Sequence, residues 1–270
     1  MKKILMVVNG ISPSTHVISF AIKSAKEGSY ILQGIFLNSS TEPAGFQYPF
    51  PNDMPLTEVQ VTMESIEEEN KSLLNSNIQL FKDECQAAGI TYEVSTDFSL
   101  KELIEQSSIA ELIILDANAD YPHFPIKDVL TGANCPVLHV GTQAPMIERV
   151  LLTYDGSEAS KYAIDKYKDA FPFFHHLPTF LVSINLSPLE ILEHKEYVNQ
   201  WLPKQFPNLT KQRLEGDVKD ELMHFLKLHS NNTLVVMGAF GRDVVSRFFH
   251  PSLANAVLAE TRISLFIAHK

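Results

Sequence analysis

The chain repeats one pattern twice, and this repetition constrains the fold more than any other feature of the sequence. KILMVVNGISPSTHVISFAI begins at Lys3, and RVLLTYDGSEASKYAIDKYK begins at Arg149. Each stretch contains a short apolar strand, a turn of sequence NG or DG, and a predicted helix that small residues precede. A second apolar run follows in both halves, ILQGIFLN in the first and TFLVSINL in the second.

The similarity resumes later in each half. DFSLKELIEQSSIAELIILDA begins at Asp97, and GDVKDELMHFLKLHSNNTLVVMGA begins at Gly216. Both have a polar start, apolar residues at helical spacing and then a continuous apolar strand. One more strand closes each half, CPVLHVG in the first and ISLFIAHK in the second.

Strands that alternate with helices predict parallel sheets of the α/β class. The strands are unbroken apolar runs, as expected where helices cover both faces of a sheet. We therefore predict two tandem doubly wound, Rossmann-like domains over residues 1–144 and 145–270, each with a five-stranded parallel sheet flanked by helices. The turn-rich stretch 141–147, GTQAPMI, marks the boundary. One continuous α/β domain is the alternative, and the matching order of five strand-like segments disfavours it.

Composition excludes several classes of protein. The chain has 270 residues, 45% of them hydrophobic, which is enough for a sizeable core. Its net charge of −10 disfavours nucleic acid and anionic membranes as partners. No apolar run reaches the length of a membrane span, and the N-terminal run 4–8 predicts a strand and not a signal peptide. Cys85 and Cys135 are too few for a disulfide framework. We expect a cytoplasmic protein with reduced thiols.

Two segments of the first half fall outside the repeat. Residues 39–57 hold four prolines, which exclude a regular helix or a central strand. This segment is either a lid over a site or a surface connector, and the connector is favoured. Residues 58–88 predict a long amphipathic helix whose EEEN run at 67–70 is its solvated face.

Ligands of open α/β sheets bind beyond the carboxyl ends of the strands, where the strand order reverses. In the second half, Asp155, Ile184 and the loop from Gly238 to Ser252 would meet there. Asp155 could accept a hydrogen bond from a ligand or simply cap a turn, and the second role is favoured. Gly238 and Gly241 could let a nucleotide approach the backbone or could be plain turn glycines. Ser252 could donate to a phosphate at a helix N-terminus or could cap that helix.

Catalytic motifs are largely missing from the sequence. It contains no GxxxxGK[ST] loop, no HExxH and no GxSxG. The ten histidines are scattered, so we predict no metal site and no catalytic residues. An enzyme, either a weak ATPase or an autokinase acting on a residue such as Ser157, is therefore the least favoured class of function.

The chain resembles the universal stress protein family in its tandem form, over nearly all of both halves. VLLTYDGSEAS is similar to the opening strand and aspartate turn of the family, and the segment from Met237 is similar to its nucleotide loop. The resemblance implies ATP binding, with Mg²⁺, in members with an intact motif. Asp155 and Ile184 would then lie at the adenine, Gly238 and Gly241 near the ribose and phosphates, and Ser252 at a phosphate.

The sequence also departs from the family pattern. Pro251 stands where the loop of the family has its third glycine, and proline has no N–H to donate to a phosphate. Losing one charged hydrogen bond, about 1.5–3 kcal/mol, would weaken binding roughly ten- to a hundredfold. In the first half, Asn9 replaces the aspartate, while Asp116 and Ala119 replace the loop glycines and the loop is shorter. We therefore predict that the first half does not bind ATP.

The resulting hypothesis is a stress-response protein with at most one adenine-nucleotide site, in the second half, that acts by binding or signalling. The alternative is a nucleotide-independent interaction protein in which both sites are degenerate, as Pro251 favours. The two halves would form an internal pseudo-dimer through residues 137–140 and 265–268, which would protect both sheet edges. Whether a homodimer also forms stays open.

Overall fold

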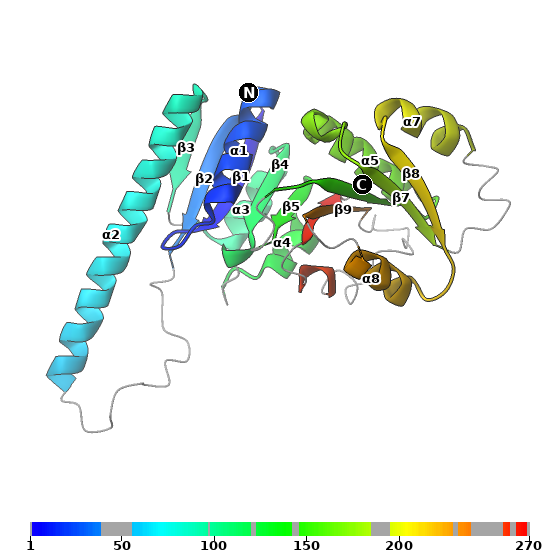
Figure 1. Cartoon of the computed structure of the whole chain (residues 1–270). Coiled ribbons are helices and arrows are strands. Elements are labelled where there is room, and N and C mark those ends of the chain that lie inside the picture. Colours follow the sequence, from blue (N-terminus) through cyan, green and yellow to red (C-terminus); the bar gives the residue numbers. More distant parts are fainter. Residues whose placement is uncertain are drawn as a thin grey trace.

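The structure is a computed structural model that describes residues 2–38, 56–96, 98–119, 123–141, 146–184, 195–228, 232–238, 256–259 and 263–268. Within it, ten strands form one sheet in the order β3-β2-β1-β4-β5-β10-β9-β6-β7-β8 (Figure 1). The strands of the first half are β1 Lys3–Asn9, β2 Ile31–Leu37, β3 Tyr92–Ser95, β4 Leu112–Asp116 and β5 Val137–Val140. Those of the second half are β6 Arg149–Thr153, β7 Thr179–Ile184, β8 Leu209–Leu214, β9 Thr233–Gly238 and β10 Ile263–Ala268.

Each half has the same strand order, and every pairing inside a half is parallel. The predicted α/β class and the five-stranded parallel sheet of each half are therefore confirmed. The halves join through β5 and β10, which pair antiparallel with Phe266 opposite Leu138. This pairing confirms the predicted internal contact between the two closing strands. It fuses both sheets into one and leaves β3 and β8 as the outer strands.

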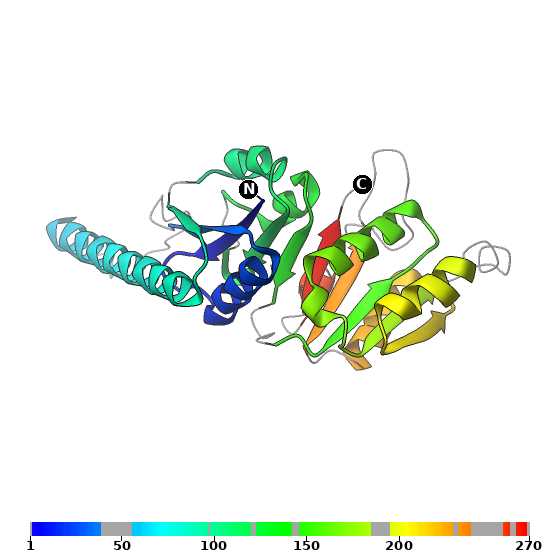
Figure 2. The same ribbon diagram turned by 90° about the horizontal axis from the view of Figure 1, so that it is seen from above.

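Helices cover both faces of the sheet, as the unbroken apolar strands require. One face packs against α1 (Thr15–Gly28), α2 (Leu56–Ala88), α5 (Glu158–Ala170) and α7 (Leu202–Gln205). The other packs against α3 (Leu100–Ser107), α4 (Ile126–Gly132) and α8 (Val218–Leu228). Short helical turns are η1 (Ala117–Ala119), η2 (Pro172–Phe174) and η3 (Tyr197–Trp201). Figure 2 shows the two halves side by side, with α2 projecting from the outer side of the first.

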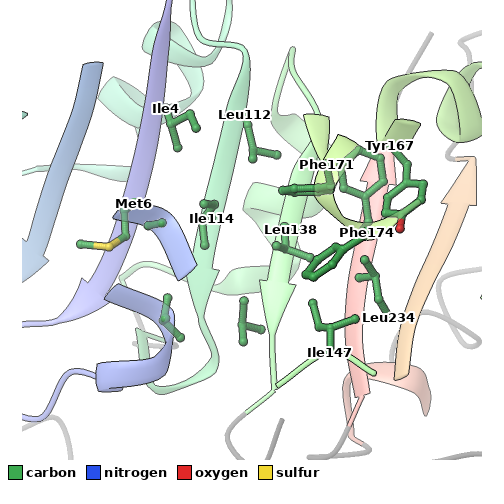
Figure 3. Packing of buried hydrophobic residues seen from close by; sticks show 14 of the residues in the cluster. Ile4, Met6, Leu112, Ile114, Leu138, Ile147, Tyr167, Phe171, Phe174 and Leu234 are labelled. Carbon is green, nitrogen blue, oxygen red and sulfur yellow. The ribbon is translucent and has the colours of Figure 1, made fainter. Parts of the chain in front are cut away.

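Aromatic side chains hold the two halves together on the face that carries α1 and α5. The Phe20 ring of α1 lies 5.5 Å from that of Phe171 and 5.8 Å from that of Phe174, both in the second half. Figure 3 shows Phe171 and Phe174 near Leu138 of β5 and Ile147, so one apolar cluster crosses the junction. The halves therefore share a core as well as a sheet.

The two segments outside the repeat have different outcomes. The predicted long helix is confirmed as α2, and Glu67, Glu68 and Glu69 are exposed on it as expected. Most of the proline-rich segment, residues 39–55, lies outside the described residues, so both of its interpretations stay open. The boundary between residues 144 and 145 stays a prediction for the same reason. No helix in the described part of the chain is long and apolar enough to cross a membrane.

Candidate functional site at the carboxyl ends of the strands

The strand order brings three of the five predicted site residues of the second half together. From β6 the chain runs outward through β7 and β8, then crosses back to β9 on the other side of β6. The strand order thus reverses between β6 and β9, where ligands of such sheets bind. Thr153 pairs with Val182, so Asp155 lies level with Ile184, the last residue of β7. Leu152 pairs with Val236, which places Gly238 level with Tyr154.

Asp155 has a structural role that accounts for its position. It is 5% exposed, and its Oδ1 accepts hydrogen bonds from the backbone N–H of Ser157, at 3.0 Å, and from its Oγ–H. Ser157 is the N-cap of α5, and its Oγ accepts from the N–H of Ser160 at 3.1 Å. Asp155 therefore orients the residue that caps the helix, which is the favoured role from the sequence. A negative charge beside this N-terminus is also stabilising.

Gly238 is required by packing. A Cβ on this residue would lie 2.4 Å from the carbonyl oxygen of Ala159 and 2.7 Å from the backbone nitrogen of Ser160. Both atoms belong to the first turn of α5, which leaves them little freedom to move. The end of β9 thus touches the helix N-terminus directly, and no side chain fits between them.

The remaining predicted contacts of the second half lie beyond the described residues. These are Gly241 and Ser252, together with Pro251. Their assignment to ribose and phosphate stays a prediction. What the structure fixes is where the loop starts, at Gly238 beside the N-terminus of α5.

The first half has an equivalent place with different chemistry. Ile4 pairs with Leu112 as Val150 pairs with Leu234, so the strand registers equate Asn9 with Asp155 and Asp116 with Gly238. The replacements inferred from the sequence at these two positions are therefore confirmed. The Oδ1 of Asn9 accepts from the backbone N–H groups of the next turn, and its Nδ2 donates to the carbonyl of Asn118 at 3.2 Å.

Asp116 fills this place with its own carboxylate. It is fully buried, and its Oδ2 accepts from the backbone N–H of Ser14 at 2.8 Å. Its Oδ1 accepts from the Ser14 Oγ–H at 2.9 Å and from the backbone N–H of Asn118 at 3.0 Å. Ser14 is the N-cap of α1, so a carboxylate from the same chain occupies the N-terminus of that helix. The sequence predicted that Asp116 replaces a loop glycine, but it did not predict these hydrogen bonds.

The two arrangements depend on where each helix begins. Ser14 follows Asn9 by five residues, as Ser160 follows Asp155, yet Ser14 is an N-cap whereas Ser160 already lies within the first turn of α5. The missing turn in the first half makes room for the Asp116 side chain. In the second half the extra turn comes into contact with Gly238.

An aromatic stack on the outer side of α5 has no counterpart in the sequence analysis. The Tyr197 ring stacks on Tyr154 at 5.7 Å and on Trp201 at 5.1 Å. The stack borders a hollow of about 450 Å³ that also contains Asp165, whose carboxyl pKa is raised by burial. Tyr197 and Trp201 are four residues apart on a helical segment, and this spacing is the sequence feature that could have indicated a contact between their rings.

Metal and thiol chemistry find no support in the described residues. Among them, no group of three or more His, Cys, Asp or Glu side chains could hold a metal ion. Cys85 and Cys135 are free, and burial raises the pKa of each thiol to about 12. Both cysteines therefore stay protonated at neutral pH and are poor nucleophiles.

Comparison with known proteins extends the similarity to the whole chain. No protein-family model and no curated protein matches the chain. A solved structure, a universal stress protein from Archaeoglobus fulgidus DSM 4304, is 16% identical and superposes with a TM-score of 0.63, covering 99% of this chain and 98% of that one. Universal stress protein UspA from Lactobacillus plantarum is 17% identical, covers 46% of this chain and 98% of its own, and has a TM-score of 0.36. The sequence resemblance is thus confirmed in the fold: over its whole length, this chain has the fold of a universal stress protein.

Proposed function

We propose that the chain is a stress-response protein of the cytoplasm that binds one adenine nucleotide, ATP with Mg²⁺, in its second half. The observation that carries this proposal is a difference between the two switch points, the places in each half where the strand order reverses. In the first half, the buried Asp116 carboxylate already accepts hydrogen bonds from the backbone N–H and the Oγ–H of Ser14, the N-cap of α1. In the second half, the equivalent residue is Gly238, so no carboxylate from the end of β9 bonds to the start of α5, which packs directly against this glycine.

The carboxyl edge of the second half also has the residues that the family resemblance requires. Asp155 and Ile184 are level with each other on adjacent strands, so one planar ligand could contact both. Asp155 is bound to Ser157, which holds its carboxylate in one orientation before any ligand arrives. Such preorganisation lowers the entropy that binding must overcome.

A second function is favoured by Asp155 and Gly238. Asp155 caps α5 through Ser157, and Gly238 allows α5 to pack on β9, so neither residue requires a ligand to explain it. Together with Pro251, this favours a protein that acts through its surface without nucleotide. Binding experiments distinguish the two functions.

The test is calorimetric titration of ATP, with and without Mg²⁺, into protein that carries no copurified nucleotide. We expect one site per chain and an affinity that falls in Asp155→Asn, which keeps an acceptor for Ser157 but removes the charge. The matched change in the other half, Asn9→Ala, should leave the affinity unchanged. Pro251→Gly should strengthen binding roughly ten- to a hundredfold, since it restores one charged hydrogen bond. Folded protein that binds no nucleotide would support the second function.

A further inference from the structure

A hollow of about 390 Å³ lies at the junction between the two halves. It is bordered by α1 and the end of β5 in the first half, and by η2 in the second. Ile147 and Phe174, which both line it, lie close together in Figure 3. A hollow of this size that is shared by two units of a chain is a typical place for a small ligand.

Most of the residues that line the hollow are apolar. Val140 and Ile147 are 3% and 8% exposed, so the core holds this part of the lining in place. Phe20 of α1 lies opposite the sequence of the other half, and its ring stacks on that of Phe174 at 5.8 Å. The branched side chains and the aromatic rings together suit an apolar ligand body, either aromatic or branched.

The polar lining comes from one side of α1. His16, Ser19 and Lys23 follow one another at intervals of three and four residues, which places them on one face over about 10 Å of helix. The Nζ of Lys23 lies 4.8 Å from the centre of the Phe173 ring in η2. Within the described part of the chain, no carboxylate pairs with this lysine, and no residue that lines the hollow is acidic. The hollow therefore carries one positive charge and no negative charge.

His16 and Ser19 add groups that can form hydrogen bonds. The Nε2 atom of His16 is buried and has no hydrogen-bond partner among the described residues. Buried polar atoms in proteins nearly always have a partner, so a ligand group that bonds this ring would supply a missing one. Ser19 is exposed at the same hollow, so its hydroxyl is accessible to a ligand.

The charge of the whole chain restricts the ligand further. With a net charge of −10, the protein as a whole does not attract anions, and a polyanion would be repelled. An anion that binds here must be held by the local lysine and by apolar contact. These two requirements together describe a small ligand with one negative charge and an apolar body.

We propose that this hollow binds a small amphipathic anion, a monocarboxylate with an aromatic or branched apolar body. The body packs on Phe20, Ile147 and Phe174, and the carboxylate pairs with Lys23 and accepts hydrogen bonds from the polar face of α1. The bound ligand contacts both halves and so strengthens their junction. No residue that lines the hollow belongs to the nucleotide site proposed for the second half.

The test is calorimetric titration of the full chain with 2-naphthoate and with 2-naphthamide, which has the same shape and no charge. We expect one naphthoate per chain, bound about fivefold more tightly than the amide, which is near the upper limit for an exposed charge pair. Lys23→Gln should remove this difference. Lys26→Gln, exposed on the same helix but outside the hollow, should preserve it. Ser19→Phe, which fills the hollow, should weaken both compounds at least tenfold while circular dichroism shows an intact fold.

Hydrogen–deuterium exchange locates the ligand. Saturating naphthoate should slow exchange in peptides covering residues 15–24 and 171–177, on both sides of the junction. Slower exchange confined to residues 153–160 would place the acid at the proposed nucleotide site and would overturn this proposal. Folded protein that binds neither 2-naphthoate nor phenylacetate at millimolar concentration would also overturn it, as would equal affinity for the acid and the amide. Neither result would affect the binding of ATP.

Discussion

Gly238→Ala tests whether the end of β9 meets the first turn of α5 as closely as the structure indicates. The added methyl group would lie 2.4 Å from the Ala159 carbonyl oxygen and 2.5 Å from its carbon. Neither atom is the end of a flexible side chain, because both belong to the backbone of a capped helix. Overpacking of this kind costs about 1–3 kcal/mol, and contact with backbone places this case at about 3 kcal/mol.

The assay is thermal unfolding followed by circular dichroism, with urea unfolding as a second measure. For a chain of this size, about 3 kcal/mol corresponds to a loss of about 6–12 °C in Tm. Gly132→Ala is the matched control, because its methyl group would meet only the side chain of Ile104, whose flexible Cδ1 lies at 3.0 Å, and alanine is the better helix former. We expect its Tm to stay within a few degrees of the wild-type value. If Gly238→Ala melts like Gly132→Ala, the proposed packing role of Gly238 is wrong.

Asp116→Ala should destabilise the protein by about 1–3 kcal/mol in urea unfolding, since it leaves the part-buried N–H groups of Ser14 and Asn118 without their acceptor. The exposed Asp83→Ala should change stability by less than about 0.5 kcal/mol, and equal effects would contradict the capping role. Cys85 and Cys135, with pKa values raised to about 12, should not react with a thiol reagent at pH 8 until the protein unfolds, and rapid labelling of native protein would refute their burial. Phe20→Ala should lower the free energy of unfolding by about 2–3 kcal/mol and separate the unfolding of the two halves, and an unchanged single transition would show that the aromatic contact does not couple them.

The internal repeat was sufficient to predict the architecture of each half. Two copies of one strand and helix pattern predict two sheets of the same order, and the resemblance to the universal stress protein family implies that the two closing strands pair. The pairing of Leu138 with Phe266 confirms that prediction. Burial of the strands follows from their unbroken apolar runs, which the sequence displays directly.

The chemistry of the two switch points was less accessible from the sequence. Asp116 and Ser14 are 102 positions apart, so their hydrogen bonds depend on tertiary structure. The start of each helix is equally hidden, because NGISPST and DGSEAS both contain good N-cap residues at several positions. For Gly238, the sequence suggests a turn or a ligand, while the required packing depends on the distance between a strand and a helix.

The central claim is that the first half is closed by its own carboxylate and that the second half is the one that binds nucleotide. Hydrogen–deuterium exchange of the whole chain, with and without saturating ATP and Mg²⁺, tests it most directly. We predict that ATP slows exchange in peptides covering residues 153–160 and 236–252. Peptides covering residues 9–16 and 114–119 should exchange at the same rate in both conditions. Slower exchange in the first half, or unchanged exchange throughout the chain, would contradict the claim.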